Sequence, residues 1–162
     1  INDISAGEMD ADLLPTVAEL NVPYVLMHMQ GTPANMQDKP EYGDVTHDVI
    51  KDLSMKMDKI RKMGIHDVII DPGFGFGKTV EDNYTLMRDL EQFKIFGAPI
   101  LVGISHKSMI YKLLETTADK TLNGTTVLNA ISLMKGANIL RVHEVKEAVE
   151  AVNIIHYLLS LR

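Results

Sequence analysis

The chain has 162 residues, of which 46% are hydrophobic and 23% are charged, with no cysteine and a net charge of −6. This composition is typical of a globular domain with a substantial core, so we expect 1–162 to form a single domain. The negative charge argues against a general nucleic-acid or anionic-membrane binder, and the lack of cysteine excludes disulfides and thiolate metal sites. No apolar run approaches the roughly 18 residues of a membrane span, and these features together favour the cytoplasm.

Short apolar runs alternate with amphipathic segments along the chain. The first run ends near Ile4, and the later ones, which we interpret as strands, cover 23–27, 68–71, 99–103 and 139–143. Apolar residues at helical spacing predict helices at 10–20, 44–63, 81–93, 105–114, 125–135 and 144–159. Residues 30–43 are rich in Gly, Pro, Asn and Gln, which predicts a mobile loop.

The last predicted helix is amphipathic. Its apolar residues recur at helical spacing and are expected to face inward: Val145, Val149, Val152, Ile155 and Leu159. The same apolar face would equally permit contact with a second copy of the chain.

The strand–loop–helix unit recurs about five times, which predicts a parallel sheet with right-handed crossovers. Polar residues follow every predicted strand: Asn2, His28, Asp71, Ser105 with Lys107, and Arg141 with His143. In a (β/α)8 barrel the carboxyl ends of all strands meet at one face, whereas a doubly wound sheet binds ligands beside one crevice. We therefore favour an α/β TIM barrel of which only about the last five βα units are present. The opening at Ile1 predicts a fragment, or a longer chain whose first part is missing here.

The most informative stretch runs from Val68 to Lys78. An apolar strand ends in Asp71 and breaks into a Pro/Gly loop that carries Phe74 and Phe76. Glycines let the backbone approach a ligand closely, and both aromatic rings are available to pack on a flat ring. A buried carboxylate needs a partner. Three roles are therefore open for Asp71: it caps the next helix, it pairs with a buried base, or it forms hydrogen bonds to a planar, nitrogen-rich ligand. We favour the third.

Three groups that can carry positive charge follow strands of an otherwise acidic chain. Lys107 lies at a predicted helix start, where a cation and free N–H groups suit an anion or a ring contact. Arg141 and His143 lie two apart on a strand end, so both should point the same way and hold a phosphate. A solvated Lys107 and a salt-bridged Arg141 are the alternatives. Asn2 offers a donor and an acceptor to a heterocycle edge, unless it only forms a turn with Asp3.

The remaining polar residues show no further site. The histidines at 28, 47, 66 and 156 do not have a metal-ligand spacing, and no nucleophile or paired-carboxylate arrangement is visible. The chemistry indicated is positioning and stabilisation of a leaving group rather than a covalent enzyme intermediate.

Four motifs together resemble the dihydropteroate synthase family, in the family's order and over the whole chain. They are Ile1-Asn2-Asp3, Asp71-Pro72-Gly73-Phe74-Gly75-Phe76-Gly77-Lys78, Gly103-Ile104-Ser105-His106-Lys107-Ser108 and Arg141-Val142-His143. The resemblance implies a TIM barrel in folate biosynthesis that condenses 6-hydroxymethyl-7,8-dihydropterin pyrophosphate with p-aminobenzoate, giving 7,8-dihydropteroate and pyrophosphate. It also implies Mg2+, inhibition by sulfonamides and a homodimer formed through the last helices.

The resemblance further implies roles for individual residues. Those matching the pterin-binding positions are Asn2, Met27, Asp71 and Lys107. Those matching the p-aminobenzoate-binding positions are Phe76, Gly103, Ser105 and Lys107. Arg141 and His143 match the pyrophosphate anchors and, with Lys107, would be the catalytic residues. The Mg2+ ligand is expected before Ile1.

Two departures from the family pattern bear on activity. His106 stands where an arginine is usual, which changes the charge expected near the second substrate. The family's first three strands, with the Asn associated with Mg2+ and pyrophosphate, have no counterpart after Ile1. A molecule that starts at Ile1 is therefore expected to show little or no turnover.

Two other functions stay open. A pterin-binding methyltransferase acting on methyl-tetrahydrofolate resembles the same barrel, but it has no use for a pyrophosphate anchor or a p-aminobenzoate loop. A non-catalytic pterin-binding module, or a fragment, would bind through Asn2 and Asp71 and release no pyrophosphate.

Overall fold

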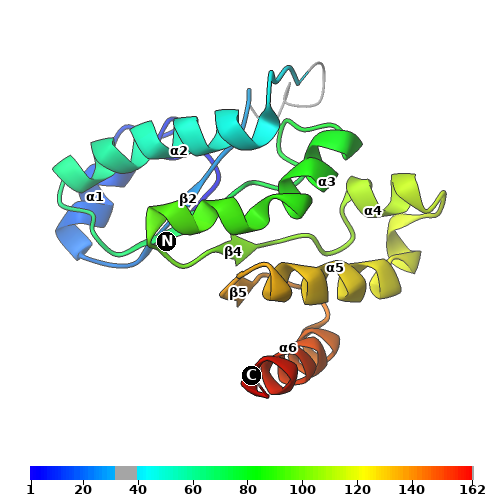
Figure 1. The fold of residues 1–162 in the computed structure, drawn as a ribbon. Helices are drawn as coiled ribbons and strands as arrows, with labels where there is room; N and C mark the ends of the chain where they lie inside the picture. The colour runs from blue at the N-terminus through cyan, green and yellow to red at the C-terminus, as the bar shows by residue number, and fades with distance from the viewer. Residues whose placement is uncertain (32–39, 162) are drawn as a thin grey trace.

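The computed structural model describes residues 1–31 and 40–161 (Figure 1). Its strands are β1 (Asn2–Asp3), β2 (Tyr24–Met27), β3 (Val68–Asp71), β4 (Leu101–Val102) and β5 (Ile139–Leu140). Its α-helices are α1 (Leu13–Leu20), α2 (Val45–Lys62), α3 (Val80–Arg88), α4 (Ser108–Leu113), α5 (Leu122–Met134) and α6 (Val145–Ser160). Short 3-10 helices are η1 (Leu90–Phe96) and η2 (Ala118–Lys120). Each predicted strand and helix has a counterpart. The core of the predicted mobile loop, 32–39, lies outside the described residues.

The described strands lie side by side in chain order. β1, β2 and β3 form a parallel sheet in which Tyr24 lies opposite Val68, and β4 and β5 form a second parallel pair. A parallel bridge between Ile70 and Ile100 joins the two. A doubly wound sheet reverses its strand order at a switch point, and the described strands show no such reversal. They form an open row rather than a closed barrel.

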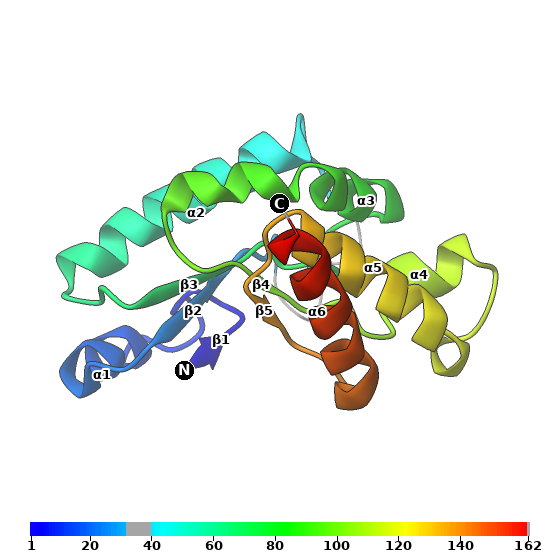
Figure 2. The same cartoon turned by 60° about the horizontal axis from the view of Figure 1, so that its bottom comes forward.

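The core lies between this row of strands and the helices that cover it. β2 is buried along its whole length, and β3 is buried on both faces apart from one half-buried residue, as its continuous apolar run predicted. Helix α2 contributes a fully buried stripe at helical spacing: Val49, Leu53, Met57 and Ile60. Figures 1 and 2 show α2 beside the β2–β3 part of the row and α6 against α5.

Local signals determine where several helices begin and end. The carboxylate of Asp44 accepts from the His47 N–H at 3.0 Å and starts α2. Thr79 and Asp82 form a capping box that starts α3, with side chain and backbone bonded in both directions. The helix predicted over 81–93 is wrong in its second half, because α3 ends at Arg88 and the chain continues as the tighter helix η1.

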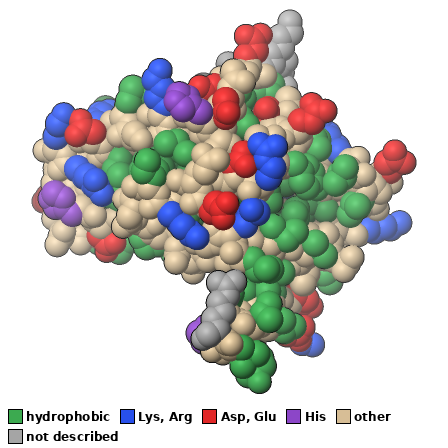
Figure 3. All heavy atoms as spheres, in the orientation of Figure 1, with side chains coloured by type: hydrophobic (Ala, Val, Ile, Leu, Met, Phe, Trp, Pro, Cys, Tyr) green, Lys and Arg blue, Asp and Glu red, His purple; other side chains and the backbone are tan. Residues whose placement is uncertain are grey.

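The predicted inward face of α6 is also wrong. The buried residues of this helix are Ala148, Ala151 and Ile155, so only Ile155 was placed correctly. Val145 and Val149 are 64% and 50% exposed. Small alanines allow the close approach to α5, and this contact turns the larger apolar residues outward. Figure 3 shows hydrophobic side chains gathering over α4, α5 and α6.

Within the described residues, none of the helices is long and apolar enough to cross a membrane.

Candidate functional site

The loop that follows β3 is pressed against the chain that follows β2. Gly73 has a φ of +72°, and a Cβ there would lie 1.9 Å from the backbone oxygen of His28. Gly77 has a φ of +63°, and a Cβ there would lie 2.4 Å from the backbone oxygen of Gln30. Only glycine fits both positions, because the conformation and the contact each exclude a side chain. This packing places Asp71 at the mouth of the loop, where its Oδ1 accepts from the Gly73 N–H at 2.8 Å.

Lys78 braces the loop from inside. Its Nζ is buried and donates to the backbone oxygens of Gly73 and Phe76 at 2.9 and 3.0 Å. It also lies 2.9 Å from Nδ1 of His28, which accepts when the lysine is protonated, because an ammonium group can only donate. Burial lowers the pKa of His28 to about 2, so the ring is neutral, and burial lowers the pKa of Lys78 to about 7 against the attraction of Asp71. The sequence interpretation assigned neither residue a structural role.

A second brace comes from helix α3. The side chain of Asn83 is buried; its Oδ1 accepts from the Gly75 N–H at 2.7 Å, and its amide nitrogen donates to the backbone oxygen of Thr79 at 2.6 Å. The loop is therefore fastened on two sides before any ligand binds. A signal was present in the sequence, since an amide in the first turn after a capping box often bonds nearby backbone.

The two phenylalanines of the loop have different environments. Phe74 is 1% exposed and packs in the core, so the prediction that it is available to a flat ligand ring is wrong. Phe76 lines a pocket, and the Nζ of Lys107 lies 4.6 Å from the centre of its ring, a cation–π contact. Lys107 also donates to the backbone oxygen of Phe74. It is half-buried and held by these two contacts, so the alternative of a solvated helix-start lysine is wrong.

At β1 the turn is organised by Asp3 rather than by Asn2. The Asp3 carboxylate accepts from the N–H groups of Ser5 and Gly7 at 3.0 and 2.6 Å, and from the hydroxyl of Tyr24 at 2.8 Å. Asn2 is consequently left to line the pocket.

One pocket collects side chains from the carboxyl end of each described strand. It has a volume of about 100 Å³ and is lined by Asn2, Ile4, Met27, Asp71, Phe76, Gly103, Lys107 and Arg141. All of the predicted site residues except Ser105 and His143 are in this set. Parallel strands bring their carboxyl ends to one edge, and for this reason residues so far apart in sequence meet.

The pocket combines one buried carboxylate with several nearby cations. Burial raises the pKa of Asp71, while the Gly73 N–H and the nearby cations Lys107, Lys78 and Arg141 oppose the rise. Burial lowers the pKa of Lys107 to about 8, against the attraction of Asp71. One carboxylate surrounded by cations suits a ligand that donates hydrogen bonds at one end and carries negative charge at the other.

Arg141 and His143 lie in different surroundings, and the strand geometry that predicted a shared direction does not extend to them. β5 ends at Leu140, so the alternation of a strand no longer applies to the residues that follow. Arg141 lines the pocket, whereas the ring of His143 lies 5.7 Å from that of His106. The predicted substrate residue Ser105 is buried, and its Oγ accepts from the His143 N–H at 3.4 Å, so it connects the two loops.

His106 forms an ion pair that the sequence interpretation missed. Its Nε2 lies 2.7 Å from Oε1 of Glu144, and its Nδ1 lies 2.7 Å from both the backbone oxygen of Ala118 and Oγ1 of Thr121. The Glu144 carboxylate, followed by the Ala118 carbonyl, raises the pKa of His106. When protonated, the histidine pairs with Glu144 at the position where the family pattern has an arginine.

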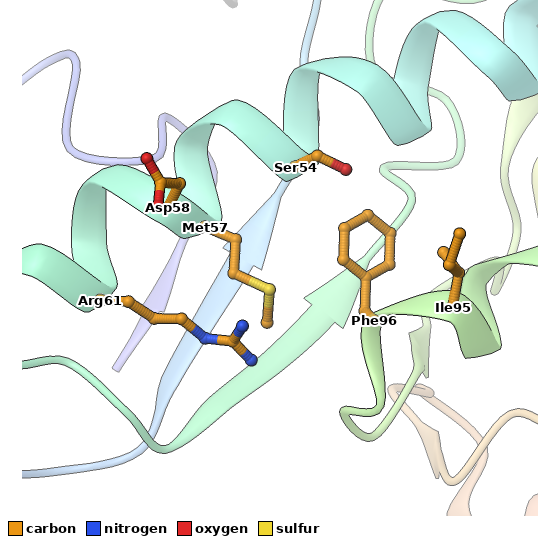
Figure 4. A pocket seen from close by; sticks show the side chains of 6 residues that line it. All are labelled: Ser54, Met57, Asp58, Arg61, Ile95 and Phe96. Atoms are coloured by element: carbon orange, nitrogen blue, oxygen red, sulfur yellow. The ribbon is translucent and has the colours of Figure 1, made fainter.

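A separate hollow lies between α2 and η1 (Figure 4). It is lined by Ser54, Met57, Asp58, Arg61, Ile95 and Phe96. The carboxyl end of α2 leads into the start of β3, so this hollow lies at the opposite end of the strands from the pocket. It brings together one carboxylate and one guanidinium, and we assign it no role.

Comparison with known proteins agrees with this geometry. The family model described as "Pterin binding enzyme" matches residues 1–143. The chain is 42% identical to dihydropteroate synthase of Escherichia coli over 165 residues, which is 100% of this chain and 58% of that protein. The corresponding protein of Haemophilus influenzae is 42% identical over 90% of this chain and 53% of its own length.

Solved structures of relatives superimpose closely. Dihydropteroate synthase of Yersinia pestis, in a sulfonamide complex, matches with a TM-score of 0.96 and 39% identity, over 99% of this chain and 58% of that one. The Thermus thermophilus enzyme in complex with 6HMPPP matches with a TM-score of 0.90 and 34% identity, over 97% and 63%. The chain thus spans a little over half the length of these relatives. With a family model that matches most of its residues, this chain belongs to the pterin-binding enzyme family.

Proposed function

We propose that the protein carrying this chain is a dihydropteroate synthase. It would join 6-hydroxymethyl-7,8-dihydropterin pyrophosphate to p-aminobenzoate, with release of pyrophosphate. The observation that carries the proposal is the single pocket in which Asp71, Lys107 and Arg141 lie together. The relatives of highest similarity described above carry the same name.

The pterin would bind through the buried carboxylate. Asp71 accepts hydrogen bonds from the amidine-like edge of the ring, and Asn2 adds a donor and an acceptor at the same end. Met27 and Lys107 pack beside the ring. The loop braced by Lys78 and Asn83 holds Asp71 in place before the ligand arrives, which lowers the cost of ordering the site.

p-Aminobenzoate would enter on the other side of the same pocket. Phe76 and Gly103 form its wall, and Lys107 offers positive charge to the benzoate carboxylate. Ser105 is buried two residues after Gly103, and its hydroxyl accepts from the backbone N–H of His143. We therefore propose that Ser105 shapes this end of the pocket through the neighbouring loop.

The reaction would proceed by loss of pyrophosphate and attack by the amine. The bond from the pterin methylene to the pyrophosphate oxygen breaks, and its electron pair leaves with the pyrophosphate. Arg141 and His143 would stabilise the charge that develops on this leaving group. The aniline nitrogen forms a bond to the methylene carbon and loses a proton, without any covalent bond to the protein.

The Mg2+ that the family resemblance implies does not fit the residues described. Mg2+ prefers oxygen ligands in octahedral geometry. Among residues 1–31 and 40–161, the cluster of three side chains close enough to hold a metal ion contains two imidazoles and one carboxylate. The Mg2+ ligands would lie outside the described residues, and no step here is derived through the ion.

The remaining features of the proposal extend beyond the described chain. They are a closed eight-stranded barrel of which 1–162 forms part as one domain, a homodimer through the last helices, sensitivity to sulfonamides and a cytoplasmic location. The in-order parallel strands support the barrel, and the exposed apolar residues of α6 support the dimer.

The test is the dependence of pyrophosphate release on both substrates. We expect the whole protein that carries this chain to release pyrophosphate only when dihydropterin pyrophosphate and p-aminobenzoate are both present. Lys107→Ala should lower kcat/KM by about 100-fold, and the exposed Lys112→Ala should leave it unchanged. Release that does not need p-aminobenzoate would contradict the proposal. Pterin binding without any release would favour a non-catalytic module, and turnover of methyl-tetrahydrofolate would favour the methyltransferase.

A further inference from the structure

Three side chains just outside the pocket present possible metal-ligand atoms to one another. One ligand atom each of His106, His143 and Glu144 lies within 4.8 Å of the others. They come from the loop after β4 and from the segment that joins β5 to α6. We propose that these three side chains form a binding site for a divalent transition-metal ion of the zinc class.

His106 is already oriented as a metal ligand. Its Nδ1 lies 2.7 Å from the backbone oxygen of Ala118 and from Oγ1 of Thr121, so Nδ1 carries the hydrogen and Nε2 faces the cluster. Metal-binding histidines commonly donate their second ring nitrogen to a carbonyl in this way, which fixes the tautomer and the ring.

Glu144 has an oxygen that needs a partner. Its Oε1 lies 2.7 Å from Nε2 of His106, but its Oε2 is buried and has no hydrogen-bond partner within the described residues. A buried carboxylate oxygen without a partner is costly. A cation bound at this point would remove the cost and would replace the proton that otherwise joins His106 to Glu144.

His143 completes the set. Its ring lies 5.7 Å from the ring of His106, and within the described residues its nitrogens make no hydrogen bond. Arg141, two residues earlier, lines the Asp71 pocket.

The ligand set selects the kind of metal. Two imidazoles and one carboxylate are a common zinc set, with a fourth position left for water or another ligand. Mg2+ prefers oxygen ligands and would bind poorly here. Metal–ligand bonds are about 2.0–2.2 Å long, and the unpartnered Oε2 of Glu144 is available for one of them. His143 also has a role in the proposed function, so a bound metal ion and pyrophosphate would compete for its ring. Titration with the metal alone, without either substrate, tests the metal site separately from that function.

The experiment is a titration of the chelator-treated protein with Zn2+ in competition with a chromophoric chelator. We expect one Zn2+ per chain with a Kd of about 1 μM or lower, unchanged by millimolar Mg2+. His106→Gln, His143→Gln and Glu144→Gln should each weaken binding about 10-fold or more. The matched control is His66→Gln, because His66 is exposed before β3 at the other end of the strands. His66→Gln should bind Zn2+ with the same Kd as the unchanged protein.

A second readout separates the metal site from loss of structure. Co2+ bound by these ligands should show visible absorption bands, and these should disappear in His143→Gln, whose side chain is exposed and whose fold should be intact by circular dichroism. The proposal is overturned if Zn2+ binds no tighter than about 100 μM, if the three variants bind as tightly as the unchanged protein, or if His66→Gln loses as much affinity as they do.

Discussion

The ends of β3 and β5 both contribute to the pocket, but they are built differently. After β3, Asp71 and Lys78 are 8% and 4% exposed, and this stretch is bonded to helix α3 and to the segment that follows β2. After β5, Arg141 and His143 are exposed, and the strand ends before either of them. The first region is organised by buried groups, and the second by a few surface contacts.

Because the two regions are built differently, substitutions in them should affect protein stability and ligand binding differently. A change after β3 leaves buried polar groups without partners, so it should reduce stability and ligand binding together. A change after β5 alters a charge in solvent, so it should reduce anion binding with little effect on folding. The following five predictions test this contrast, and the largest expected effect comes first.

Gly73→Ala should destabilise the protein by about 4 kcal/mol in denaturant unfolding, because strain and a steric clash add. The matched control is Gly97→Ala. Both glycines have a positive φ, but a Cβ at Gly97 meets no atom within 4 Å, whereas at Gly73 it meets the backbone of His28. Gly97→Ala should lower the free energy of unfolding by about 1 kcal/mol. Equal losses would show that the close contact after β3 is unimportant.

Lys78→Met should lower the free energy of unfolding by about 3 kcal/mol. The substitution removes the ammonium group that contacts the carbonyls of Gly73 and Phe76 and the ring of His28. The control Lys112→Met, at an exposed position, should change the free energy of unfolding by no more than about 0.5 kcal/mol. If Lys78→Met changes the free energy of unfolding as little as this control does, Lys78 does not stabilise the loop.

The same variant tests the pH dependence. Burial lowers the pKa of Lys78 from 10.5 to about 7, so between these values the unfolded chain binds a proton that the folded chain does not. The contribution of Lys78 to stability should therefore rise as pH increases from 7 to 10.5. Unfolding curves of both proteins across this range measure it, and a difference between them that falls with pH would contradict the lowered pKa.

Asp71→Asn should weaken dihydropterin binding by about 100-fold, since the amide cannot accept two hydrogen bonds as a carboxylate does. The pKa of Asp71 is raised by burial, so binding to the unchanged protein should weaken as pH falls, and should do so at a higher pH than for an ordinary carboxyl group. Calorimetric titration over pH checks both effects, with the exposed Asp67→Asn as control. A pH profile shared by Asp71→Asn and the unchanged protein would assign the titration to another group.

Arg141→Ala should weaken pyrophosphate binding by about 10-fold while changing the free energy of unfolding by no more than about 0.5 kcal/mol. Titration with pyrophosphate and denaturant unfolding measure the two quantities. Arg61→Ala, on the exposed face of α2, is the control for the loss of a positive charge. A large loss of stability in Arg141→Ala would show that the segment after β5 also contributes to folding, against the contrast drawn above.

Much of the fold and of the site followed from local sequence. The apolar run that ends in Asp71 predicted β3, and the order of strands and helices predicted a parallel row. Because parallel strands present their carboxyl ends at one edge, the polar residues after them could be expected to meet, and Asn2, Lys107 and Arg141 do line one pocket with Asp71. These are properties of short segments and of the direction in which strands run.

Other features depend on contacts between distant segments, which no local pattern contains. Lys78 is buried in contact with His28, 50 residues earlier in the sequence. The ring of His143 lies beside His106 because β5 ends at Leu140. Helix α6 buries its alanines because it packs on α5. The sequence by itself determined where the strands end and which polar residues follow them. Only the tertiary structure decided which of those side chains enter the pocket, since that depends on the neighbours that packing provides.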